Sequence, residues 1–485
     1  MKALITLLLL SMASLVWSQD TQAKIEAVEN SLNFPATFTF EQDIPKANIL
    51  QRLKEEKIHG ASVAVIHNGK IHWAKGYGVR ELGSPEPVTT NTLFQCASIG
   101  KMITAIAAMQ LVEKGLISLD ENINEKLVRW KIKENNLTKA QPVTLRHLLS
   151  HSAGLTDEYG FLGYGPKDEI PTPLQILNGA SPTKNKKSLE VKVQPGTVER
   201  YSGGGYLIVQ LLIEDLTDIS FAEYVEQNIF TPLGMQSATY HNRPDLEQGK
   251  VIAAGHLYNG KALKKKKYHI YPEKAAAGFW TTAEDLARFV LGVQAATKGE
   301  SGAVLTQESI QEVLTPQINR KGLGVNLRGI EAPKAFWHAG QNLGYTGLVY
   351  GLIEEGEGAV ILLNSDGGEK LMQEFVSSVA LTYNWPVMKS VKSLPISKEL
   401  SNRLAGLYRN DETKQEFSIK VMDGVPKVVV GGSKQAFQLI RVNDSEYTFE
   451  SAQDYYRLSF NFEAQTPRLI YRESIGKALT LEKVN

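Results

Sequence analysis

The spacing of hydrophobic and polar positions changes several times along the chain, and each change predicts a different kind of element. Residues 46–58 have the spacing of an amphipathic helix. The two strand-like runs that follow, Ser62–His67 and Lys70–Lys75, are separated by Asn-Gly, the strongest short signal for a β-hairpin. From Ser98 to about Arg320 the spacing is helical, interrupted by loops rich in glycine and proline.

Strand-like patterns return at the end of this region. Tyr345–Ile353 and Ala359–Asn364 flank an acidic turn that contains glycine, and Glu369–Tyr383 is helical. Strands at both ends, with helices inserted between them, indicate an antiparallel sheet with helices packed on it and a separate helical lobe. We therefore predict an α+β unit over residues 19–385.

The pattern changes again beyond residue 385. Residues 386–397 have mixed polarity and include prolines, and we interpret them as a linker. Residues 398–485 contain eight short strand-like runs at roughly ten-residue spacing, separated by Asp-Gly, Gly-Gly and Asn-Asp turns. Regular short strands of this kind predict a small all-β barrel or sandwich, which we expect to fold independently.

The first eighteen residues have the pattern of an export signal. Lys2 precedes an apolar stretch, Ala3–Val16, that is too short to span a bilayer, and Ser18 suits the position before a cleavage site. We expect a signal peptide over residues 1–18, a periplasmic or secreted bacterial location, and no stable membrane insertion after cleavage. The single cysteine excludes a disulfide framework, which agrees with export from a bacterial cell.

Composition excludes several functional classes. Lys and Arg number 53 against 52 Asp and Glu, so the net charge of +1 lacks the basic excess that is typical of nucleic-acid binding. One cysteine also excludes a zinc or iron–sulfur site built from several thiolates. His147 and His151 are four residues apart, but no third ligand has a suitable spacing. We therefore expect no metal site, no cofactor and no nucleic-acid partner.

One stretch combines helical spacing with reactive side chains. Apolar residues recur from Ile99 to Val112, and Gly115 is placed to end the helix. Ser98 and Lys101 lie in its first turn, three positions apart, so the ammonium is within reach of the hydroxyl. The N-terminus of the helix favours negative charge beside Ser98. Alternatively, Ser98 is a simple helix cap, a position that serine favours.

Two later stretches make this pair more specific. Tyr201-Ser-Gly203 precedes a helix, and a His-Ala-Gly-Gln run that begins at His338 precedes two strands. In this order the three motifs resemble those of the serine β-lactamase and penicillin-binding superfamily, nearest to the class C β-lactamase-like hydrolases. The resemblance covers about residues 45–385 and implies the β-lactamase/transpeptidase-like fold. The C-terminal unit resembles the lipocalin-like barrel often appended to such hydrolases.

The resemblance implies a role for each motif residue. Ser98 would be the nucleophile that forms an acyl-enzyme. Lys101 and Tyr201 would share the work of the general base, and either neutral Lys101 or the Tyr201 phenolate would take the proton. The backbone N–H groups of Ser98 and Gln341 would form the oxyanion hole, and Gly340 would let a substrate approach the strand closely.

Two positions depart from the family pattern. Gly203 stands where the family presents an asparagine amide to the acylamide of the substrate, and His338 stands where the β-lactamases hold a lysine. A histidine is mostly neutral above its ordinary pKa near 6.5, so it anchors a carboxylate less well than a permanent cation. Both changes affect substrate recognition, which favours an esterase or peptidase over an efficient β-lactamase.

We therefore expect an exported serine hydrolase that cleaves an ester or amide in a small-molecule or peptide substrate. The alternatives are a D-amino-acid peptidase or amidase, a weak β-lactamase, and a non-catalytic protein that binds β-lactams or muropeptides. The intact set of Ser98, Lys101 and Tyr201 speaks against the non-catalytic alternative.

Overall fold

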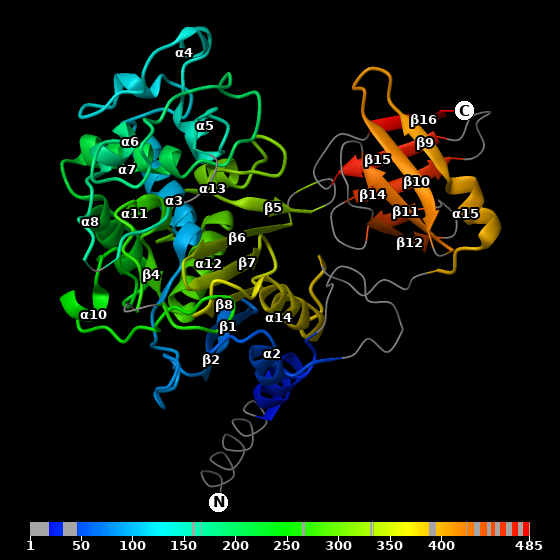
Figure 1. The fold of residues 1–485 in the computed structure, drawn as a ribbon, viewed down its shortest axis with the longest axis horizontal. Helices are drawn as coiled ribbons and strands as arrows, with labels where there is room; N and C mark the ends of the chain where they lie inside the picture. Colours follow the sequence, from blue (N-terminus) through cyan, green and yellow to red (C-terminus); the bar gives the residue numbers. More distant parts are fainter. Residues whose placement is uncertain are drawn as a thin grey trace, which may run out of the picture.

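The computed structural model describes residues 19–32, 46–157, 161–165, 167–263, 267–329, 332, 334–387, 394–422, 424–430, 437–443, 448–451, 456–461, 468–473 and 479–484. The expected export signal lies outside these described residues. Within them, a sheet covered by helices is followed by a barrel, drawn in orange to red in Figure 1. No helix of the described ranges combines the length and the apolar character needed to cross a membrane.

The first unit is built on a six-stranded antiparallel sheet with the order β2-β1-β8-β7-β6-β5. The N-terminal hairpin joins the C-terminal strands through β1 and β8, where Ala61 lies opposite Leu363, as the prediction of strands at both ends requires. Asn68 and Gly69 connect β1 to β2 with φ values of 51° and 70°, as a two-residue turn of this kind demands. The strands are β1 (Gly60–His67), β2 (Lys70–Gly78), β5 (Asn326–Arg328), β6 (Ala335–Asn342), β7 (Tyr345–Leu352) and β8 (Gly358–Leu363).

Helices cover both faces of this sheet. On one face, Ala64 and Ile66 of β1 share a hydrophobic core with α12 (Ala283–Thr297) and the helical lobe. On the other face, the intervening residues of β1 pack with α2 (Ile49–Glu55) and α14 (Glu369–Thr382). Because β1 is buried on both sides, its sequence is an almost unbroken apolar run instead of an alternating one.

The N-terminal helices differ from the sequence prediction in one respect. The helix predicted over residues 46–58 is the shorter α2, because Asn48 caps its start by accepting a hydrogen bond from Leu50 N at 2.8 Å. Residues 19–29 form a further helix, and Val28 within it joins the core beneath α14.

The helical lobe is built around α3 and α7, which lie against each other and are buried on nearly every side. Because α3 and α7 are buried on nearly every side, their sequences are almost continuously apolar. The elements between β2 and β5 are β3 (Phe94–Gln95), η1 (Ala97–Ile99), α3 (Gly100–Glu113), η2 (Ile123–Glu125), α4 (Asn136–Ala140), α5 (Leu145–Leu149), α6 (Pro173–Asn178), α7 (Gly203–Thr217), α8 (Phe221–Val225), η3 (Glu226–Phe230), α9 (Thr231–Leu233), α10 (Pro244–Glu247), α11 (Lys274–Ala277), β4 (Trp280–Thr281), α12 and α13 (Gln307–Val313).

The C-terminal unit is a closed antiparallel barrel in which the strands follow the order β10-β11-β12-β13-β14-β15-β16-β9. The predicted all-β barrel is thus confirmed. Tyr408, Phe417 and Leu481 belong to a hydrophobic cluster that is separate from the two clusters of the first unit. Helix α15 (Lys398–Leu404), which the strand pattern does not predict, adds Leu404 to this cluster. The strands are β9 (Gly406–Arg409), β10 (Glu416–Met422), β11 (Val425–Val430), β12 (Phe437–Asn443), β13 (Thr448–Ser451), β14 (Tyr456–Asn461), β15 (Arg468–Glu473) and β16 (Leu479–Val484).

Candidate active site

Ser98 lies in the short turn η1, which joins strand β3 to helix α3. Ala97, immediately before it, has a φ of 46°, a left-handed backbone that residues other than glycine seldom adopt. A hydrogen bond of 2.8 Å from Cys96 N to Phe279 O holds the turn. Such strain persists where the surrounding structure enforces it, and here it presents a half-buried hydroxyl at the start of a buried helix.

The side chain of Lys101 is only 2% exposed, and its ammonium group contacts Ser98. Nζ donates to Ser98 Oγ at 3.1 Å and to Ala276 O of α11 at 2.7 Å. It also lies over two aromatic rings, 5.0 Å from the centre of Tyr201 and 5.4 Å from that of Tyr206. The lysine is therefore held in one position by a carbonyl and two ring faces.

Tyr201 contacts the same hydroxyl. Its OH donates to Ser98 Oγ at 2.8 Å, so the sequence-predicted trio of Ser98, Lys101 and Tyr201 meets around one oxygen atom. The ring of Tyr201 lies 4.2 Å from that of His151, at an interplanar angle of 30°. This aromatic contact fixes the plane of the phenol.

His151 is a supporting residue that sequence reasoning interpreted only as structural. Its Nδ1 accepts a hydrogen bond from Ser202 N at 3.1 Å, and burial holds its pKa well below the ordinary value. A neutral His151 thus links the segment before α7 to the ring of Tyr201. No group of residues that could hold a metal ion occurs within the described part of the chain. His147, which lies four residues before His151, belongs to the capping box of α5.

Asp157 is a second residue that sequence reasoning missed. Its carboxylate accepts from Ser202 Oγ at 2.6 Å and from Gly204 N at 2.5 Å. Burial raises the pKa of Asp157, while these two hydrogen bonds act in the opposite direction. Ser202 in turn accepts from Gly205 N at 2.8 Å and caps α7. The segment that carries Tyr201 is therefore anchored by a half-buried carboxylate.

The third motif lies on strand β6, beside the nucleophile turn. A Cβ atom added to Gly340 would lie 2.1 Å from Cys96 O, so glycine is required for β6 to pack against the turn that carries Ser98. The expected approach of a substrate to this glycine stays a prediction. Gln341 follows it with an exposed side chain whose Nε2 donates to Asp366 O at 2.9 Å.

His338 of β6 is buried and neutral. Its Nδ1 donates to Ala339 O at 2.6 Å. Burial, together with the nearby ammonium groups of Lys101 and Lys321, lowers the pKa of His338 to about 3. The structure therefore agrees with the sequence interpretation that this motif offers no cation from His338. Lys321, which the sequence did not single out, contributes the positive charge near this position.

Gly203 is the first residue of α7, and an aromatic ring occupies the space where its side chain would be. A Cβ atom at this position would lie 2.8 Å from Cε2 and 3.1 Å from Cζ of Phe161. The missing asparagine of the second motif is thus replaced in space by a phenyl ring from a distant segment. The local sequence around residue 203 does not predict this contact.

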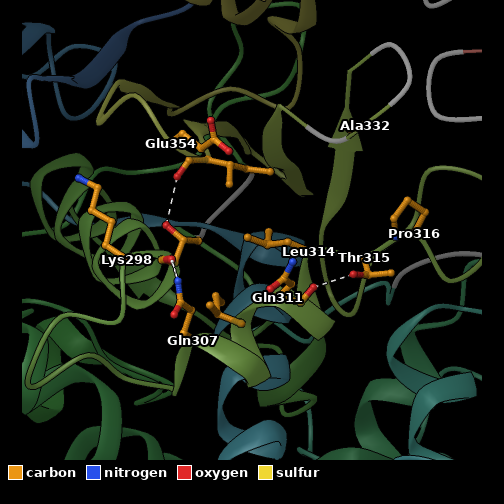
Figure 2. Close-up of a pocket in the computed structure, with 11 residues that line it drawn as sticks. Lys298, Gln307, Gln311, Leu314, Thr315, Pro316, Ala332 and Glu354 are labelled. Carbon is orange, nitrogen blue, oxygen red and sulfur yellow. Dashed lines mark hydrogen bonds between the residues drawn. The ribbon is translucent and has the colours of Figure 1, made fainter.

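A separate hollow of about 460 Å³ lies between α12, α13 and the turn that joins β7 to β8 (Figure 2). No motif residue lines it, so it is not part of the Ser98 site. Its lining residues are Thr297, Lys298, Gln307, Ile310, Gln311, Leu314, Thr315, Pro316, Ala332, Ile353 and Glu354.

Comparisons with known proteins agree with this geometry. The family model described as Beta-lactamase matches residues 46–380. A teichoic acid D-alanine hydrolase of Staphylococcus aureus (strain MRSA252) is 27% identical over 251 residues, which are 52% of this chain and 58% of the relative. The chain therefore matches little more than half the length of this curated relative.

Solved structures show the same fold. The octameric penicillin-binding protein homologue from Pyrococcus abyssi matches 90% of this chain and 98% of its own, with a TM-score of 0.58 and 24% identity. The D-amino acid amidase from Ochrobactrum anthropi SV3 matches 69% of this chain and 96% of its own, with a TM-score of 0.56 and 23% identity. Together with the family match over most of its length, these findings establish that the chain belongs to the Beta-lactamase family.

Proposed function

We propose that this protein hydrolyses small esters through an acyl-enzyme formed on Ser98. The observation that carries the proposal is the meeting of two proton-carrying groups at one hydroxyl, with Lys101 Nζ at 3.1 Å and Tyr201 OH at 2.8 Å from Ser98 Oγ. Membership of the Beta-lactamase family supports this assignment, since its motifs place a serine nucleophile at this position.

The reaction follows from this arrangement in two similar halves. Ser98 Oγ attacks the ester carbonyl carbon while its proton passes to Lys101 in its neutral form or to Tyr201 as a phenolate. The tetrahedral intermediate then breaks the bond to the leaving alcohol, which takes that proton. Water repeats the sequence on the acyl-enzyme and releases the acid. The backbone N–H groups of Ser98 and Gln341 would stabilise the negative oxygen in both halves.

The recognition positions support an ester with a small acyl group over a β-lactam. Gly203 offers no amide to an acylamide, and a neutral His338 offers no cation to a carboxylate. Among esters, we infer that D-alanyl esters are the first to test, because curated relatives are named teichoic acid D-alanine hydrolase. Export through a signal at residues 1–18 would place the enzyme in the periplasm or outside the cell.

The test is labelling of the full chain with a fluorophosphonate, followed by turnover of 4-nitrophenyl acetate and a D-alanyl ester. We expect Ser98 to be labelled and both esters to be turned over. Ser98→Ala should lose both properties, whereas Ser301→Ala, which alters an exposed serine in a turn, should keep them. Ester turnover by Ser98→Ala at the wild-type rate would refute the proposed function, and stoichiometric labelling without turnover would indicate a binding protein.

A further inference from the structure

The ring of Phe161 lies against Gly203, the last residue of the second motif. Gly203 is two residues beyond Tyr201, whose OH is 2.8 Å from Ser98 Oγ. A Cβ at Gly203 would touch Phe161 at 2.8 Å from Cε2. The ring therefore takes the place of a side chain that would otherwise be projected from the start of α7, two residues after the tyrosine that contacts the reacting hydroxyl.

The segment that carries Phe161 is built into the protein. Tyr164 and Ile270 exchange two backbone hydrogen bonds of 2.7 Å, and His269 Nδ1 donates to Leu162 O at 3.1 Å. Phe161 itself packs against the main hydrophobic core and is partly exposed, whereas the side chain of the next residue, Leu162, is largely exposed at 71%. The position of the ring is thus supported from the core side.

We propose that Phe161 is a specificity-determining residue that forms one wall of the acyl-binding site. This proposal rests on the Ser98 acyl-enzyme described above. The ring accepts an alkyl or arylalkyl group attached to the scissile carbonyl, because apolar carbon gains by contact with an aromatic surface. It disfavours an acyl group with an acylamide on the α-carbon, because the ring supplies no hydrogen-bond partner for the amide.

The expected discrimination follows from the cost of an unpaired polar group. A buried amide that loses its partners is disfavoured by about ten- to a hundredfold in binding. The substrate class is therefore simple acyl esters, including aminoacyl esters whose amino group is free, in contrast to N-acylated aminoacyl compounds.

The test compares two substrates that differ only in the acylamide, 4-nitrophenyl propionate and 4-nitrophenyl N-acetyl-D-alaninate. In the wild-type chain we expect kcat/KM to favour the propionate at least tenfold. Phe161→Ala should reduce this ratio at least fivefold, mainly by slowing the propionate. Leu162→Ala is the matched control, since it shortens the neighbouring, exposed apolar side chain, and its ratio should equal that of the wild type.

Two further variants test the spatial replacement itself. Gly203→Asn alone should displace the outer part of the Phe161 ring, because its Cβ would lie 2.8 Å from Cε2, and should lower the preference for the propionate. Phe161→Ala combined with Gly203→Asn should favour the N-acetyl substrate more strongly, since the ring is removed and an amide is restored. Phe161→Gln keeps most of the side-chain length and supplies an amide, so its ratio should also fall.

Thermal unfolding of each variant shows which of them are folded. If Phe161→Ala is not folded, the ratio of the two kcat/KM values in Phe161→Gln tests the proposal instead. A folded Phe161→Ala or Phe161→Gln variant that slows both substrates equally, leaving the ratio within twofold of the wild type, would overturn the proposal. An equal shift in Leu162→Ala would overturn it too. Both results differ from retained turnover in Ser98→Ala, which would refute the acyl-enzyme itself.

Discussion

The site has two halves that differ in how closely they keep the pattern of the Beta-lactamase family. In the acylation half, Lys101 and Tyr201 meet at Ser98 Oγ, and buried contacts with Ala276 O and His151 support them. In the recognition half, an amide and a cation of the family pattern are replaced by glycine, a phenyl ring and a neutral histidine. The two halves lie next to each other, since Gly203 follows Tyr201 by two residues and Gly340 packs against the turn that carries Ser98, so the trio is kept beside positions where the recognition groups differ.

The largest effect should come from the acylation half. Lys101→Ala removes a proton-carrying group at 3.1 Å from Ser98 Oγ, so kcat/KM for 4-nitrophenyl acetate should fall by roughly 10²–10⁴. Lys114→Ala is the matched control, because Lys114 lies at the exposed end of the same helix and its Nζ donates to Tyr224 OH. Retention of more than about half the activity in Lys101→Ala would make Lys101 merely structural.

Tyr201→Phe removes only the hydroxyl that donates to Ser98 Oγ and keeps the ring that lies against His151. We expect a loss of about 10²-fold in kcat/KM, near the lower end of the usual scale for a general acid–base group. The melting temperature should change little, because the aromatic contacts remain. An unchanged kcat/KM would assign all proton transfer to Lys101.

The recognition half should determine which of two substrates has the higher kcat/KM. The wild-type enzyme should hydrolyse 4-nitrophenyl acetate with a kcat/KM about ten- to a hundredfold higher than that for a chromogenic cephalosporin. The cephalosporin brings an acylamide for which Gly203 and Phe161 supply no amide, and an unpaired buried group costs about 1–3 kcal/mol. A preference for the cephalosporin would mean that another residue supplies the missing amide.

A smaller effect concerns stability and pH. The pKa of buried His338 is about 3 in the folded state, against an ordinary value near 6.5, so the unfolded chain binds the additional proton between these values. The contribution of His338 to the free energy of unfolding should therefore be complete above pH 6.5. It should fall as the pH drops toward 3, by at most about 1.4 kcal/mol per pH unit. Urea unfolding at pH 7.5, 5.5 and 4.5 measures the slope.

His338→Gln should have a shallower slope than the wild type, whereas Ser301→Ala, which alters an exposed side chain that does not titrate in this range, should keep the wild-type slope. Equal slopes in all three proteins would show that His338 is protonated in the folded state.

The smallest effect on the site should come from the barrel. Trp385 Nε1 donates to Glu357 Oε2 at 3.1 Å in the first unit, and Leu394 N donates to Arg441 O at 2.8 Å in the barrel. Protease cleavage between Trp385 and Ile396 should therefore yield two soluble fragments, and the first should keep its esterase activity within about twofold. Precipitation of a fragment spanning residues 19–390 would show instead that the barrel covers apolar surface of the first unit.

The amino-acid sequence alone determined the elements and the chemistry of the acylation half. The Asn-Gly turn, the apolar runs and the three motifs predict the hairpin, the sheet built from both chain ends, the barrel and the trio around Ser98. The hairpin, the sheet and the barrel depend on local spacing, which is visible in the chain itself, whereas the trio around Ser98 followed from the resemblance of the three motifs to a known family. The capped start of α2 and the helix α15 were missed because a short helix depends on caps and packing more than on periodicity.

Only the tertiary structure decided what surrounds the motifs. The ring of Phe161 over Gly203, the carbonyl of Cys96 over Gly340 and the carboxylate of Asp157 at the start of α7 come from distant segments. No spacing rule reveals such contacts, because they arise when separate elements pack together. For the same reason the sequence identified Gly203 as a lost amide, but only the fold showed that an aromatic ring fills its place.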